Sequence, residues 1–283
     1  MKKLICLLLC LLLLPLISAA EEDELLIEDV VEDVELDDSN DTDTPAGSPE
    51  WTFPVALKDL DPGMIRIANK HYLLDSKFVP EPLVTVKARK TGKKGTSGHV
   101  YKASGASMQL QQTCLEALTA MCEAAEADGF KLYLKSAYRS YKTQKTMYYN
   151  RLKKNNGKDD GWVAMPGSSD HQTGLGCDVV PRSWRDKPMN GKMGAEPECR
   201  WMAEHCSEFG FILRYPEDKE NETEINYEPW HMRYVGIPAA VYIMENGLCL
   251  EEFNDQLQEA IRGYLDAGGD PDAVSALIQT PEA

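Results

Sequence analysis

The uneven distribution of charge along the chain sets the strongest limit on how it can fold. Residues 21–50 contain 14 Asp and Glu residues and no Lys or Arg. Such a segment cannot bury enough apolar surface to offset the entropy lost on ordering, so we expect an acidic disordered spacer there. Residues 51–283 contain 32 acidic and 28 basic residues, which accounts for −4 of the formal charge of −16. We therefore expect one folded domain over residues 51–268 and a flexible tail over residues 269–283.

The first 20 residues have the pattern of a secretory signal peptide. Lys2 and Lys3 precede an apolar run over residues 4–17, and Ser18 and Ala20 stand at the small-residue positions before a cleavage site. The run is shorter than the roughly 20 residues that span a bilayer. We therefore expect an exported protein, extracellular or associated with the cell envelope. The alternative is an uncleaved signal that anchors the chain in the membrane.

Helix and strand patterns follow one another in mixed order over residues 107–267. Apolar periodicity predicts helices over residues 107–128, 141–154, 198–209, 238–246 and 250–267, and short apolar or alternating runs predict strands over residues 131–135, 175–180, 211–215 and 232–235. Ser140 is suited to cap the second helix. Residues 51–90 show few helical signals, so we expect irregular structure there. The pattern is typical of an α+β domain with a small antiparallel sheet flanked by helices.

Six cysteines remain once a signal peptide is removed: Cys114, Cys122, Cys177, Cys199, Cys206 and Cys249. An even number in an exported chain permits disulfides, and the sequence leaves their connectivity open. Cys114 and Cys122 would lie about 12 Å apart along a continuous helix, beyond the ~7 Å that separates the Cα atoms of a disulfide. Free buried thiols are the alternative.

Two short segments combine histidine with carboxylates. His171 and Asp178 enclose a glycine-containing turn, so a ligand at the end of a loop and one on the following strand can converge. Glu228 and His231 lie three residues apart, with a stiffening proline and the apolar Trp230 between them. A hydrolytic zinc site uses three protein ligands and leaves a fourth position for water. The two segments supply His, Asp, His and a spare carboxylate, which predicts a zinc hydrolase centre.

These segments resemble the signatures of the VanY-type zinc D-alanyl-D-alanine carboxypeptidases, which are LAS-type metallopeptidases. Residues 169–178 (SDHQTGLGCD) are similar to the family pattern SxHxxGxAxD, with Gly176 where the family usually has Ala. Residues 228–236 (EPWHMRYVG) are similar to its ExWH segment, and residues 136–144 (SAYRSYKTQ) to its SxYRS…Q element. The resemblance covers roughly residues 64–245. It implies a LAS/hedgehog-like fold with the zinc site in a central cleft.

The resemblance also implies roles for individual residues. His171, Asp178 and His231 would hold one Zn²⁺ ion, and Glu228 would be the general base that passes a proton from the attacking water to the leaving amine. Arg139 would stabilise the oxyanion or pair with a substrate carboxylate; a buried ion pair that orders its loop is the alternative. The candidates for substrate contacts are Ser136, Tyr138, Gln144, Ser169 and Trp230.

Together these features predict an exported zinc metallocarboxypeptidase that removes the C-terminal D-alanine from peptidoglycan stem peptides. One alternative is an L,D-carboxypeptidase that trims tetrapeptide stems with the same centre. Another is a non-catalytic zinc-containing module that binds cell-wall peptide, against which the presence of Glu228 and Arg139 argues. The acidic charge argues against broad electrostatic binding to nucleic acid. We expect a monomer that contacts the membrane only if the signal is retained as an anchor.

Overall fold

The structure is a computed structural model, and it describes residues 49–90 and 98–281. The expected signal peptide and nearly all of the expected acidic spacer lie outside the described residues. The described part belongs to one structural unit. No helix in residues 49–90 and 98–281 is long and apolar enough to cross a membrane.

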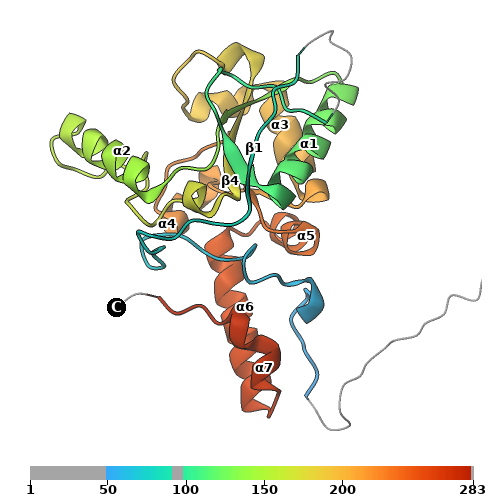
Figure 1. The fold of residues 1–283 in the computed structure, drawn as a ribbon. Coiled ribbons are helices and arrows are strands. Elements are labelled where there is room, and N and C mark those ends of the chain that lie inside the picture. The colour runs from blue at the N-terminus through green and yellow to red at the C-terminus, as the bar shows by residue number, and fades with distance from the viewer. Residues whose placement is uncertain (1–48, 91–97, 282–283) are drawn as a thin grey trace, which may run out of the picture. The chain divides into compact units, whose positions relative to one another are not determined.

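A four-stranded antiparallel sheet lies at the centre of this unit (Figure 1). Its strands run in the order β3 (Leu132–Ser136), β4 (Gly176–Pro181), β6 (His231–Tyr234) and β5 (Phe211–Leu213). β4 and β6 are neighbours in the middle of the sheet, and their register places Asp178 opposite His231. The sheet therefore joins the two segments that carry the predicted metal ligands.

Helices cover the sheet and form a second core below it. α1 (Gln112–Ala127) and α3 (Pro197–His205) pack against β3 and β4, and α5 (Ile237–Glu245) packs against β5. The long α6 (Leu250–Asp266) buries Phe253, Leu257 and Ile261 against α5 and the irregular residues 53–65. α2 (Tyr141–Lys154) extends away from the sheet, and the short α4 (Glu220–Thr223) and α7 (Pro271–Val274) complete the helices (Figure 1). The predicted α+β class with a small antiparallel sheet is confirmed.

Two predicted helix boundaries differ from the structure. α1 begins at Gln112 and not at residue 107, because residues 109–111 form β2 (Gln109–Gln111) and pair with β1 (Leu83–Thr85). The helix predicted over residues 198–209 ends at His205, and a tighter 3₁₀ turn over Cys206–Phe209 leads into the left-handed Gly210. Strand pairing replaces the start of the first apolar pattern, and a tighter turn replaces the end of the second.

The C-terminal segment also differs from the flexible tail expected over residues 269–283. Val274 and Leu277 are buried in the second core. The side chain of Gln279 accepts a hydrogen bond from the amide of Ile67 at 2.8 Å, and its backbone amide donates to Gln258 on α6 at 3.2 Å. Residues 271–279 therefore pack on α6, which a short polar sequence does not reveal.

All six cysteines of the described chain are buried free thiols, so the alternative without disulfides is the one found. Burial raises the pKa of Cys122, Cys199, Cys206 and Cys249 to about 12. Cys177 points into the main core beside Cys114, away from the side of the sheet that its neighbour Asp178 faces.

Candidate metal centre and active-site pocket

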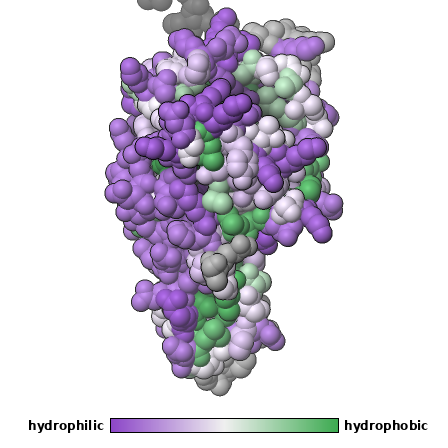
Figure 2. Space-filling view, turned by 90° about the vertical axis from the view of Figure 1, so that its left-hand side faces the viewer, coloured by the Kyte–Doolittle hydropathy of each residue, from purple (hydrophilic) through white to green (hydrophobic). Residues whose placement is uncertain are grey.

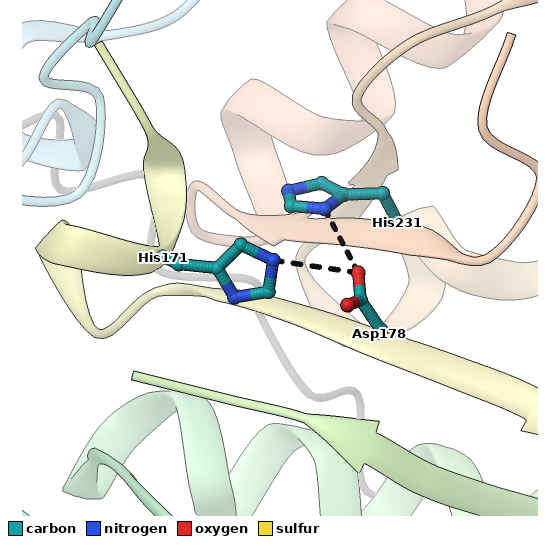
Figure 3. Close-up of side chains that lie close together, drawn as sticks. All are labelled: His171, Asp178 and His231. Atoms are coloured by element: carbon teal, nitrogen blue, oxygen red, sulfur yellow. Dashed lines mark hydrogen bonds and ion pairs between the residues drawn. The ribbon is translucent and has the colours of Figure 1, made fainter. Parts of the chain in front are cut away.

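Three buried side chains meet at the centre of the sheet: His171, Asp178 and His231 (Figure 3). Asp178 comes from β4 and His231 from the first position of β6. His171 lies in a 3₁₀ turn over Asp170–Thr173, which Gly174 ends with a φ of 69°. That left-handed conformation suits glycine, and it turns the chain back into β4.

The distances among these side chains fit a tetrahedral zinc ion. Oδ1 of Asp178 lies 3.4 Å from Nε2 of His171 and 3.1 Å from Nδ1 of His231, and all three ligand atoms lie within 4.8 Å of one another. Ligand atoms about 2.0–2.1 Å from a tetrahedral Zn²⁺ lie roughly 3.3 Å apart. The two short distances agree with this value, so the site is already shaped for such an ion.

The hydrogen bonds of His171 also indicate a cation at this point. Its Nδ1 lies 2.7 Å from the carbonyl oxygen of Ala137, so Nδ1 carries the proton of the neutral ring and Nε2 presents a lone pair to Asp178. Burial and the charge of Arg139 lower the pKa of His171 and oppose the charged imidazolium. Burial alone would raise the pKa of Asp178, but the two histidines hold it well below the usual value. An aligned lone pair and a carboxylate facing each other suit a bound metal ion.

Glu228 lies directly beside these ligands. Its Oε2 is 3.7 Å from Nδ1 of His231, and its backbone amide donates to the carbonyl of Tyr215 at 3.1 Å. Burial, reinforced by the charge of Asp178, raises the pKa of Glu228 well above the usual value, while Arg139 lowers it. A carboxyl group with a raised pKa is suited to both accept and return a proton near neutral pH. A metal cation at the site would lower this pKa again.

Arg139 is held in place by two other residues of the same motif. Its Nη1 donates to Oε1 of Gln144 at 2.7 Å, and its Nη2 donates to Oγ of Ser136 at 3.2 Å. Gln144 is in turn fixed through a bond from its Nε2 to the carbonyl of Ala164. No carboxylate among the described residues forms a salt bridge with Arg139. The alternative of a structural ion pair is therefore not what is found.

These residues line one open pocket of about 330 Å³. Ser169, Gln144 and Trp230 line it together with Arg139 and Glu228, as expected for substrate contacts. Ser136 lies behind Arg139 and acts through it. Tyr138 does not line the pocket, so the structure separates it from the other candidates.

Aromatic residues that the sequence did not single out form part of the wall. Trp162 stacks on Trp230 with ring centroids 6.3 Å apart and planes inclined by 14°. The ring of Tyr215 lies 5.0 Å from that of His231. Neither position belongs to a motif. Trp162 follows Gly161 in a polar loop, and Tyr215 ends the run predicted as a strand over residues 211–215.

A buried charge network supports the turn that carries His171. Asp170 accepts a hydrogen bond from Nε of Arg214 at 2.6 Å and is also bonded to Arg233. Arg214 donates to both oxygens of Glu251 on α6, at 2.7 and 2.6 Å. Burial alone would raise the pKa of Asp170, but Arg233 and Arg214 hold it below the usual value. The network ties α6 to the metal centre.

Comparisons with known proteins agree with this geometry. The family model of the D-alanyl-D-alanine carboxypeptidase VanY matches residues 107–237. YodJ of Bacillus subtilis (strain 168) is 34% identical over 197 residues, which cover 69% of this chain and 68% of YodJ. The bifunctional D-Ala-D-Ala dipeptidase and carboxypeptidase VanXYC of Enterococcus gallinarum is 37% identical over 135 residues, or 46% of this chain and 70% of VanXYC.

Two solved structures are similar in fold. The LdcB LD-carboxypeptidase has a TM-score of 0.58 and 34% identity, covering 69% of this chain and 87% of the other. A mutant of the D,D-pentapeptidase VanY in complex with Zn(II) has a TM-score of 0.51 and 28% identity, covering 68% of this chain and 98% of the other.

Proposed function

The chain belongs to the VanY family of D-alanyl-D-alanine carboxypeptidases, and from that premise we propose that it hydrolyses the terminal bond of peptidoglycan stem peptides and releases D-alanine. The observation that carries the proposal is one pocket lined by the three predicted metal ligands, a carboxyl group with a raised pKa, and an arginine that forms no salt bridge with any described residue. A binding module needs the ligands alone. Glu228 and Arg139 would add an acid–base group and a positive charge that such a module does not require.

The cofactor is one zinc ion, held by His171, Asp178 and His231. When bound, it polarises the scissile carbonyl and lowers the pKa of water. Glu228 would take a proton from the attacking water and return it to the leaving amine. Arg139 presents its guanidinium to the oxyanion or to the terminal carboxylate of the substrate. The stacked Trp162 and Trp230 exclude water from one side of the pocket.

Amino-acid release from two muropeptides tests the proposal. One ends in D-Ala-D-Ala, and the other is a tetrapeptide that ends in a single D-Ala after an L-centre. Each is incubated with the zinc-loaded protein, with chelator, and with Glu228→Ala. We expect release from the pentapeptide alone, lost with chelator and lowered by about a thousandfold or more in the variant. No release from either substrate by a zinc-loaded, folded protein would overturn the proposal.

The second candidate is an L,D-carboxypeptidase, which the likeness to LdcB favours. The same ligands, base and arginine would serve that reaction, because the bond cleaved is again the amide before a C-terminal D-alanine. The residue before that bond differs in its configuration and its side chain. Release from the tetrapeptide alone, with the same loss in Glu228→Ala, would establish this activity in place of the first.

We also propose that the protein is exported and acts in the cell envelope. Support comes from Lys2 and Lys3, the apolar run after them and the small residues Ser18 and Ala20. N-terminal sequencing of the protein recovered from producing cells checks this. A mature chain that begins at Glu21 supports export, and an intact Met1 in the cytosolic fraction contradicts it.

A further inference from the structure

One face of α2 forms a wall of the pocket that leads away from the metal centre. Gln144, Met147 and Arg151 all line the pocket, and their spacing of three and four residues puts them on the same side of the helix. Gln144 bonds directly to Arg139. Arg151 lies about 10 Å farther along the helix axis, at a rise of 1.5 Å per residue. The pocket therefore has an arginine at each end of this wall.

The guanidinium of Arg151 is fixed on one edge and free on the other. Its Nε lies 3.0 and 2.9 Å from the two oxygens of Asp160, and its Nη2 lies 2.5 Å from Oδ2. This side-on pairing uses two of the five N–H groups of the fork. Nη1 has no hydrogen-bond partner in residues 49–90 and 98–281, and the side chain is 38% exposed. The end-on edge of Arg151 remains available to a ligand.

Asp160 is itself anchored to the segment that carries the catalytic base. The side-chain amide of Asn226 donates to the carbonyl of Asp160 at 2.7 Å, and its backbone amide donates to Gly161 at 3.0 Å. Gly161 has a φ of +72°, and a Cβ there would lie 2.9 Å from the Asn226 amide. Asn226 precedes Glu228 by two residues. Arg151 is thus held at a defined place relative to the reacting bond.

We propose that Arg151 is a specificity-determining residue that binds a second carboxylate of the substrate, upstream of the scissile bond. The inference rests on the proposed function. An extended peptide rises about 3.3 Å per residue, so the ~10 Å between the two ends of the wall corresponds to roughly three residues. The end-on edge of a guanidinium matches a carboxylate with two parallel hydrogen bonds. Met147 and Trp162 line the same pocket and add apolar surface to it, and hydrogen bonds are stronger in less polar surroundings.

This carboxylate has two possible sources in a stem peptide. One is the side-chain carboxylate of a diamino-dicarboxylic acid at the third position. The other is the free α-carboxylate of a γ-linked glutamate at the second position. Both present the same chemistry to Arg151, and amidation removes the charge from either one separately.

The test uses four synthetic pentapeptides that share a D-Ala-D-Ala end: the parent, each of the two single amides, and the double amide. Each is hydrolysed by the zinc-loaded wild type, by Arg151→Gln, and by Lys153→Gln as a control on the exposed side of α2. We expect Arg151→Gln to lower kcat/KM for the parent by about 10–100-fold, the value of a charge-assisted hydrogen bond. Amidation of the recognised carboxylate should lower kcat/KM of the wild type by the same factor. On that amidated peptide, Arg151→Gln should have no further effect.

An equal loss on all four peptides, or no loss on the parent, overturns the proposal. Circular dichroism and zinc content check that Arg151→Gln is folded, and Arg151→Lys serves as a second variant that keeps the charge without the fork. If wild type hydrolyses no peptide, the proposed function fails. Calorimetric binding of the same four peptides to zinc-loaded Glu228→Ala, with and without Arg151→Gln, then decides the inference by itself.

Discussion

At the scale of single residues, Gly176 lies against the turn that carries a metal ligand. A Cβ at this position would lie 2.9 Å from both the carbonyl carbon and the Cβ of Asp170. The space beside Gly176 is filled by Asp170, the residue before His171. The lack of a side chain at Gly176 is therefore coupled to the local packing of Asp170.

We predict that Gly176→Ala displaces this turn and weakens zinc binding by about 10–100-fold, the usual effect of disturbing the support of a ligand. Competition with a chromogenic chelator measures the affinity. Gly105→Ala is the matched control, because nothing lies within 4 Å of a Cβ there. Unchanged zinc affinity in Gly176→Ala would show that the turn accommodates the methyl group.

Asp170 should make stability depend on acid pH. Its pKa is held below the usual value in the folded state, so the unfolded chain binds the proton first, near pH 4. The contribution of Asp170 to the unfolding free energy is complete above that pH. It is lost as the pH falls through the pKa of Asp170 in the folded state. Asp170→Asn should cost about 3–5 kcal/mol at pH 7 by breaking a buried pair. Its unfolding free energy should then fall less steeply below pH 4 than that of wild type.

Urea unfolding in excess chelator, from pH 7 to pH 3, measures this without competition from zinc. Asp255→Asn, an exposed site on α6, is the control. If the unfolding free energies of wild type and Asp170→Asn fell with the same slope below pH 4, the assignment would be contradicted.

The motifs of the sequence predicted the residue types of the site. They could not indicate the network around Asp170, because Arg214 and Arg233 meet Asp170 only once β5 and β6 pair.

At the scale of elements, the sequence predicted the bounds of α2, the helix after Arg139, but not the start of α1. α2 has its expected bounds, and Ser140 caps it by accepting the amide of Thr143 at 3.3 Å. These are local signals that a short segment carries in itself. The start of α1 was misplaced because residues 109–111 take their structure from β1, a partner more than twenty residues away. Pairing of this kind overrides the helical pattern.

We predict that Ser140→Ala lowers the unfolding free energy by about 1 kcal/mol. Because Gln144 in the first turn of α2 holds Arg139, kcat/KM should fall by about fivefold, the equivalent of a similar free energy. Thermal unfolding and release of D-alanine are measured together. Asn150→Ala, on an exposed part of α2, should change neither by as much. If Ser140→Ala lost stability but kept full activity, the helix cap would not contribute to the placement of Arg139.

At the scale of the whole folded unit, the C-terminus belongs to the second core. Polar side chains cover most of the face shown in Figure 2, and hydrophobic ones appear in small groups between them and toward its lower end. Val274 and Leu277 are buried in the second core together with residues of α6. α6 is in turn linked to the metal centre through Glu251. The sequence predicted a loose tail because a few apolar residues among polar ones give no periodic signal.

Removal of residues 270–283 should therefore destabilise the protein by about 3–5 kcal/mol, since burial of an aliphatic side chain contributes roughly 1.5–3 kcal/mol. Urea unfolding measures the effect, and a chain that ends at Thr280 is the control because it keeps Val274, Leu277 and Gln279. Equal midpoints for both truncated chains would contradict the packing. Zinc affinity should fall less than stability, because Glu251 is retained.

The reactivity of the six buried thiols can be used to measure how often the core opens. At pH 8 a thiol with a pKa of about 12 is almost entirely protonated, and four of the six have that value. A thiol reagent therefore reacts only when the core opens, and mass spectrometry can time each cysteine separately. Cys114 and Cys177 report on the sheet behind the metal centre, and Cys249 reports on the start of α6. Bound zinc should slow the labelling of Cys114 and Cys177 more than the labelling of Cys249.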